Sequence, residues 1–243
     1  MDKIQQLQDM IDQSQNIVFF GGAGVSTESN IPDFRSSDGI YSVKLGRHFT
    51  AEQLVSHTMF ERYPQEFFDF YKKYLLYPNA KPNAAHAYLA HLEKTGKLKA
   101  VVTQNIDSLH EMAGSKNVLK LHGSADRNFC LNCQRFYDLK AFLALPGTVP
   151  YCPDCGGMIK PDVTLYEEPL DMETFQQAAQ AIHQADLLII GGTSLVVYPA
   201  ASLIQYFAGK YLVVINKTSI PQDSQADLVI EGKIGEVLGK LKH

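Results

Sequence analysis

The chain has 243 residues, of which 45% are hydrophobic and 20% are charged, as in an ordinary globular domain. Disorder as the main state is disfavoured because hydrophobic residues are plentiful. Binding to nucleic acid is not expected, because 22 basic residues are outnumbered by 26 acidic ones and no basic run occurs. The composition indicates a soluble, compact and mildly acidic protein.

Two segments bear on the location of the protein. Residues 1–7 lack the apolar stretch of a secretory signal. Residues 187–209 carry no charge, but they contain Gly191, Gly192 and Pro199 and are therefore typical of a strand, a turn and a helix rather than of one apolar helix. We expect no membrane span and a cytoplasmic location.

Six short apolar runs predict the strands of one sheet. They are nearly continuous rather than alternating, as expected for parallel strands that are buried on both faces. Helical patterns precede the first, second and fourth runs, and a closing helix is expected over 235–241, so that the chain predicts a doubly wound, Rossmann-type α/β sheet. The runs are 17–20, 100–103, 118–121, 187–190, 212–215 and 228–230.

Two segments do not follow this alternation of strands and helices. Residues 37–80 are helical in pattern and rich in aromatic side chains, whereas residues 126–160 contain all four cysteines and no long apolar run. We expect both to be insertions that together form a smaller domain. The larger, Rossmann-type domain would then comprise 1–36, 81–125 and 161–243.

A glycine-rich turn, 21–26, follows the first predicted strand directly. Glycines in such a turn let the backbone approach a phosphate, and the N-terminus of the next helix supplies unpaired N–H groups. Thr27 replaces the third glycine of the usual dinucleotide motif, so this turn alone does not distinguish a phosphate site from a structural turn.

Polar or glycine-rich residues follow four other predicted strands as well. Ligands of open α/β sheets bind beyond the carboxyl ends of the strands. Five such ends in register therefore predict one ligand site at this edge of the sheet. The segments are 21–26, 103–107, 122–123, 192–195 and 216–217, and the loop 31–35 follows the first of them.

These motifs together resemble the sirtuin family of NAD-dependent protein-lysine deacylases. The resemblance covers nearly the whole chain and rests on GAGVSTESNIPDFR at 22–35, TQNID at 103–107, HG at 122–123, GTSLVVYPA at 192–200 and the paired cysteines. It implies that NAD reacts with an acyl-lysine protein or peptide. The products would be nicotinamide, free lysine and O-acyl-ADP-ribose. One departure is Asn30, where the family usually has glycine; asparagine tolerates a left-handed conformation better than other such replacements.

The resemblance also implies a set of NAD contacts. Residues of 22–35 would line the NAD site, residues 104–107 would hold the nicotinamide ribose and carboxamide, and the later strand ends would meet the adenosine half. The full set is Gly22, Ala23, Thr27, Asp33, Phe34, Arg35, Gln104, Asn105, Ile106, Asp107, His122, Gly192, Thr193, Ser194, Asn216 and Ile234.

His122 differs from the other histidines because it follows an apolar strand and precedes a glycine, and we expect it to lie exposed at the strand end. A histidine is suited to accept a proton near neutral pH. Its position alone leaves a catalytic and a packing role equally open. The resemblance implies that His122 is the base, which would deprotonate a ribose hydroxyl after the acyl oxygen has displaced nicotinamide, and that Asn105 is also catalytic.

The four cysteines form two pairs, Cys130-x-x-Cys133 and Cys152-x-x-Cys155, close to the spacing of a zinc ribbon. Four thiolates complete a tetrahedron and leave no open position, so we expect one structural Zn²⁺. A redox-active disulfide pair is the alternative interpretation. Metal binding rather than disulfide bonding favours a reducing compartment.

Residues 160–168 resemble the substrate-binding segment of the family, which implies peptide contacts from Val163, Leu165 and Tyr166. The usual Phe-Gly-Glu of this segment is here Tyr166-Glu167-Glu168, so the local backbone geometry is in question. Some members recognise acidic acyl groups through Tyr-x-x-Arg. Here Tyr71 is followed three residues later by Tyr74, which predicts an apolar slot for acetyl or longer fatty acyl groups.

Three other functions remain open at this point. A protein mono-ADP-ribosyltransferase would use the same NAD site, and an NAD-linked dehydrogenase would use the same turn. A zinc-ribbon nucleic-acid module is the third, although basic residues around the cysteines are few. A deacetylase is the prediction that accounts for all of the motifs.

Overall fold

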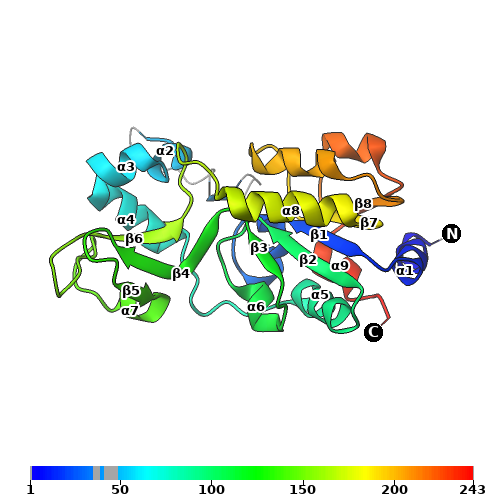
Figure 1. Ribbon diagram of the computed structural model, residues 1–243, viewed down its shortest axis with the longest axis horizontal. Helices are drawn as coiled ribbons and strands as arrows, with labels where there is room; N and C mark the ends of the chain where they lie inside the picture. The colour runs from blue at the N-terminus through cyan, green and yellow to red at the C-terminus, as the bar shows by residue number, and fades with distance from the viewer. Residues whose placement is uncertain (1, 35–38, 41–48, 243) are drawn as a thin grey trace.

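The computed structural model describes residues 2–34, 39–40 and 49–242. The described chain forms a larger lobe built on β1–β3 and β7–β9 and a smaller lobe built on β4–β6 (Figure 1). Helix α1 lies at the end of the larger lobe that is farthest from the smaller one (Figure 1). Among the described residues, no helix combines the length and the apolar character that crossing a membrane requires.

The larger lobe contains a six-stranded parallel sheet in the order β3-β2-β1-β7-β8-β9. Each predicted apolar run overlaps one of these strands, so the predicted doubly wound sheet is confirmed. The chain passes from β1 to β2 and β3 on one side and later to β7 on the other, which places the switch point between β1 and β7. The strands are β1 Ile17–Gly21, β2 Leu98–Thr103, β3 Val118–Lys120, β7 Leu187–Gly191, β8 Tyr211–Asn216 and β9 Leu228–Glu231.

Helices cover both faces of this sheet. Ile17 and Phe19 of β1 point into one core, where α1 (Lys3–Gln13), α5 (Ala84–Lys94) and α9 (Ile234–Leu238) pack. The alternate residues Val18 and Phe20 point into a second core, under α8 (Met172–Gln184) and the 3₁₀ helix η4 (Ala200–Tyr206). The closing helix is shorter than the one predicted over 235–241.

The smaller lobe joins a three-stranded antiparallel sheet, in the order β5-β4-β6, to a group of short helices. Its core is aromatic, with Phe60, Phe67 and Phe68 packed edge to face. The elements are α2 Ala51–Leu54, α3 His57–Arg62, α4 Pro64–Tyr74, β4 Gly123–Cys130, β5 Phe136–Asp138, α7 Leu139–Leu143 and β6 Ile159–Val163. The sequence did not predict these strands.

The connection after β1 contains no α-helix directly after the strand in the part of the chain that the structure describes. Two 3₁₀ turns follow the strand, η1 (Ala23–Val25) and η2 (Thr27–Ser29). Asn30 then ends η2 in the left-handed conformation, with φ 63° and ψ 27°. The residue that replaces the family's glycine therefore adopts the conformation for which glycine is usually chosen.

Candidate active site

A cavity of about 570 Å³ lies at the carboxyl ends of β1, β2, β7 and β8, and residues of both lobes line it. Every predicted NAD residue that the structure describes contributes to its lining, from Gly22 after β1 to Ile234 at the start of α9. The predicted peptide residues Val163, Leu165 and Tyr166 line the same cavity. Arg35 lies outside the described residues.

The two glycine-rich turns touch each other at the switch point. The amide of Gly24 donates to the carbonyl of Gly192 at 2.8 Å, and a Cβ on Gly24 would lie 2.7 Å from the Cα of Gly192. Only glycine allows this approach. The second turn is held from β8, because the Asn216 side chain accepts from the Thr193 amide at 3.0 Å and donates to the Thr193 carbonyl at 2.9 Å.

A polar network connects the first turn to the loop after β2. Ser26 Oγ donates to Asp107 Oδ2 at 2.8 Å and accepts from Asn105 Nδ2 at 3.0 Å. Burial raises the pKa of Asp107, and hydrogen bonds from the Leu109 amide and Ser26 oppose this shift. Ser26 was not among the predicted site residues, although its position at the end of the glycine-rich turn was a usable signal.

His122 follows β3 and faces the loop after β2. Its Nδ1 lies 2.9 Å from the carbonyl oxygen of Gln104. A carbonyl oxygen can only accept, so Nδ1 carries the proton of the neutral ring and Nε2 has the free lone pair. Burial lowers the pKa of His122, and the contact with Gln104 offsets this only in part. The prediction that His122 is exposed is wrong, since β4 begins at the next residue and leaves it half-buried.

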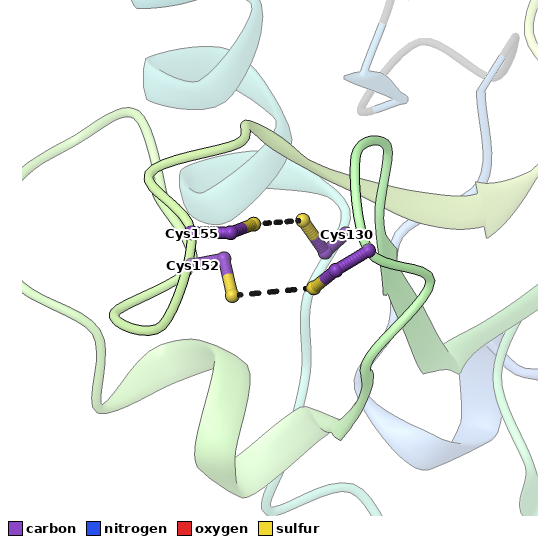
Figure 2. Close-up of side chains that lie close together, drawn as sticks. Cys130, Cys152 and Cys155 are labelled. Atoms are coloured by element: carbon purple, nitrogen blue, oxygen red, sulfur yellow. Dashed lines mark hydrogen bonds between the residues drawn. The ribbon is translucent and has the colours of Figure 1, made fainter.

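The four cysteines converge in the smaller lobe, with all their sulfur atoms within 4.8 Å of one another. Cys130 and Cys155 have sulfurs 3.4 Å apart, and those of Cys133 and Cys152 are 3.7 Å apart (Figure 2). A tetrahedral zinc with Zn–S bonds of about 2.3 Å requires sulfurs about 3.8 Å apart. The residues therefore fit a structural zinc ion, and none of the four is in a disulfide.

One of the four cysteine sulfurs also accepts a hydrogen bond from a neighbouring tyrosine. The Tyr137 hydroxyl donates to Cys152 Sγ at 3.1 Å, and this tyrosine is buried. A hydrogen bond to a ligating sulfur orients the ligand and disperses its charge. None of the four cysteines lines the cavity, which fits a structural rather than a catalytic metal.

The aromatic residues that replace the Tyr-x-x-Arg pair also lie at the cavity. Tyr71 and Tyr74 both contribute to its lining. Lys72 is directed elsewhere, since its Nζ donates to the Gly147 carbonyl at 3.1 Å. Among the described residues, Lys217 and Lys233 are the lysines and arginines that line the cavity, and both follow the last strands of the sheet.

Comparisons with solved structures place this fold and cavity in a known class. A Sir2 structure with a p53 peptide and NAD⁺ superposes with a TM-score of 0.85 at 36% identity, covering 97% of this chain and 95% of that one. A Sir2 structure with a deacetylated p53 peptide and 3′-O-acetyl ADP-ribose gives a TM-score of 0.88 at 35% identity over the same shares. The class is that of the sirtuins.

Comparisons with protein sequences point to the same family as the solved structures. The Sir2 family model matches residues 22–199, and the chain belongs to the Sir2 family. A Clostridium perfringens protein named NAD-dependent protein deacetylase is 65% identical over 99% of this chain and 98% of its own length. A Staphylococcus aureus protein of the same name is 42% identical over 98% of this chain and 97% of its own length. The resemblance to sirtuins is therefore confirmed.

Proposed function

We propose that this protein is an NAD-dependent deacetylase that removes acetyl and related acyl groups from lysine side chains of proteins. One observation carries the proposal: the glycine-rich turns after β1 and β7, His122 and the segment 163–166 all line one cavity. NAD is consumed as a co-substrate and supplies the ADP-ribose that receives the acyl group. The products are nicotinamide, free lysine and O-acyl-ADP-ribose.

His122 is the general base in this proposal. Its lowered pKa keeps the ring neutral at neutral pH, and the Gln104 carbonyl holds the tautomer in which Nε2 can take a proton. After the acyl oxygen has attacked C1′ of the nicotinamide ribose and nicotinamide has left, His122 removes a proton from a ribose hydroxyl. That oxygen attacks the acyl carbon, and water completes the release of lysine.

Asn105 is the second catalytic residue that we propose. Its side chain is almost fully buried and donates to Ser26, which in turn donates to Asp107. These contacts fix the orientation of the Asn105 side-chain amide. Together with Gln104 and Ile106, it would orient the nicotinamide ribose and carboxamide for attack.

The remaining NAD contacts are proposed from their place around the cavity. The close packing of Gly24 on Gly192 lets both backbones approach the pyrophosphate. Gly192, Thr193, Ser194, Asn216 and Ile234 would meet the adenosine half. Gly22, Ala23, Thr27, Asp33, Phe34 and Arg35 would line the opposite part of the site.

We also propose the domain division and location expected from the sequence. The described part of the larger domain, within 1–36, 81–125 and 161–243, is supported by the two cores on either face of the parallel sheet. The smaller domain, within 37–80 and 126–160, is supported by an aromatic core that also takes in Ala125, Val163 and Leu165 at its boundaries. A cytoplasmic location is supported by four thiols that need to stay reduced to hold zinc.

The test is mass spectrometry of the products formed from NAD and an acetyl-lysine peptide. The proposal expects deacetylated peptide, nicotinamide and O-acetyl-ADP-ribose in equal amounts. Nicotinamide release that does not need the acetyl group, with ADP-ribose attached to the peptide or protein, would instead support an ADP-ribosyltransferase. Reduction of NAD would support a dehydrogenase.

A further inference from the structure

The proposed peptide-binding segment is held on the smaller lobe by the start of α3. Tyr166 forms a parallel bridge with Ser56, the residue before this helix. The His57 amide donates to the Tyr166 carbonyl at 2.9 Å, and the Tyr166 amide donates to the Val55 carbonyl at 3.1 Å. The position of the segment therefore depends on its contacts with residues 55–58.

Glu167 stands where the family pattern of this segment has glycine. Its backbone is left-handed, with φ 77°. Glycine adopts this conformation freely, whereas a residue with a Cβ is strained in it. Glutamate at this position therefore needs an interaction that compensates for the strain.

The side chain of Glu167 makes such an interaction. Its Oε2 accepts from the Thr58 amide at 2.9 Å and from Thr58 Oγ1 at 2.7 Å. The Thr58 amide lies in the first turn of α3, where backbone N–H groups lack partners within the helix. These two hydrogen bonds lower the pKa of Glu167, so the carboxylate stays charged at neutral pH.

Glu168, the next residue, makes contacts on the other side of the segment. Glu168 accepts from the Leu165 amide at 2.9 Å and from Lys160 Nζ at 3.2 Å, and it lies 2.9 Å from His57 Nδ1. Glu168 thus closes the turn of the segment on itself and also contacts His57, the first residue of α3. Glu167 alone of the pair connects this turn to Thr58.

We infer that Glu167 is a positioning residue for the acyl-lysine substrate: its carboxylate, bound to Thr58, fixes the left-handed turn that sets the orientation of Val163, Leu165 and Tyr166. This inference rests on the proposed function of that segment. Glu167 does not touch the reacting atoms. Its loss therefore affects peptide binding rather than the chemical step or the NAD site.

The test compares steady-state kinetics of Glu167→Gly and Glu167→Gln with the unaltered enzyme. Glycine relieves the backbone strain but removes the contact with Thr58, whereas glutamine keeps an oxygen that can accept from it. We expect Glu167→Gly to raise the peptide KM about fivefold, the effect of losing one side-chain cap, with kcat and the KM of NAD unchanged. Glu167→Gln should stay within about twofold of the unaltered enzyme on the same grounds.

Two further variants separate positioning from general stability. Thr58→Val removes one donor of the pair, and it should raise the peptide KM without adding to the effect of Glu167→Gly when the two are combined. Gln134→Gly is the matched control, because Gln134 is also a left-handed residue, with φ 60°, and does not line the cavity. It should leave all kinetic constants unchanged.

An unchanged peptide KM in a folded Glu167→Gly enzyme would overturn the inference and leave the proposed function intact. Equal changes in Glu167→Gly and Glu167→Gln, or a change confined to the KM of NAD, would overturn it as well. The failure of the unaltered enzyme to deacetylate any peptide would instead overturn the proposed function, and the inference with it. Thermal unfolding of each variant shows whether a KM change accompanies a loss of fold.

Discussion

We predict that acetyl groups are preferred over succinyl groups, because of the residues near Tyr71. Tyr71 and Tyr74 line the cavity, and we expect a succinyl group to bring its carboxylate to this part of it. Tyr71 is fully buried, and both its burial and the negative charge of Asp126 raise its pKa. The same surroundings disfavour a second carboxylate, because a buried charge without a partner is costly.

The size of the difference in kcat/KM between the two peptides depends on which groups could neutralise the succinyl carboxylate. The Tyr71 hydroxyl has no hydrogen-bond partner among the described residues and could donate one neutral hydrogen bond. Lys72 is held at the Gly147 carbonyl and over the ring of Phe142, 5.5 Å from its centre. If about 1.4 kcal/mol of charge pairing is missing in the transition state, kcat/KM is about tenfold lower for the succinyl peptide than for the acetyl peptide.

The assay is a competition between acetyl- and succinyl-lysine peptides of one sequence, with limiting enzyme and saturating NAD. Tyr74→Arg should raise the relative rate of the succinyl peptide about tenfold, because a guanidinium can bind a carboxylate through two hydrogen bonds. Lys73→Arg is the matched control, since a residue two positions from Tyr71 does not share its helix face. Equal or faster consumption of the succinyl peptide by the unaltered enzyme would show that Tyr71 and Tyr74 do not disfavour a carboxylate.

Three other predictions concern the base, the metal and the glycine contact. His122→Ala should lower kcat about 10²–10⁴-fold while the fold is kept. The pH profile of the unaltered enzyme checks the same residue: a base must be neutral, and burial lowers the pKa of His122, so kcat/KM should fall as the pH drops through a value below the ordinary histidine pKa. Cys130→Ala or Cys152→Ala should lose zinc, measured by metal analysis, and unfold the smaller lobe at lower temperature, because zinc binding is coupled to folding; full metal content in a variant would contradict the assigned ligands. Gly24→Ala should lower the free energy of unfolding by about 1–3 kcal/mol and raise the KM of NAD, since its methyl group would meet the Gly192 backbone. Unchanged unfolding and NAD kinetics would show that the two turns are not in close contact.

The sheet of the larger lobe could be predicted because its strands are buried on both faces and therefore consist of continuous apolar runs. Strand β4 could not, because its middle carries Asp126, Arg127 and Asn128 and so has no such run. Its partner β6 contains Pro161, which also argues against a strand by local propensity. These strands form through pairing across the chain rather than through local preference.

The candidate site was predictable to the extent that its residues follow strands. The ends of parallel strands lie at one edge of a sheet, so the sequence order of the motifs already implied that they meet. The burial of His122 was not predictable, because it depends on the direction that the chain takes after β3. The contact of Glu167 with Thr58 was not predictable either, since 109 residues separate the two and only the tertiary fold brings them together.

We propose that the cavity transfers an acyl group from lysine to ADP-ribose with His122 as the base. The most direct measurement is mass spectrometry of a reaction containing NAD and an acetyl-lysine peptide, run in parallel with the unaltered enzyme and with folded His122→Ala. We expect the unaltered enzyme to form O-acetyl-ADP-ribose in an amount equal to the deacetylated peptide, and His122→Ala to form neither at a comparable rate. Deacetylation without O-acetyl-ADP-ribose, or near-normal product formation by His122→Ala, would contradict it.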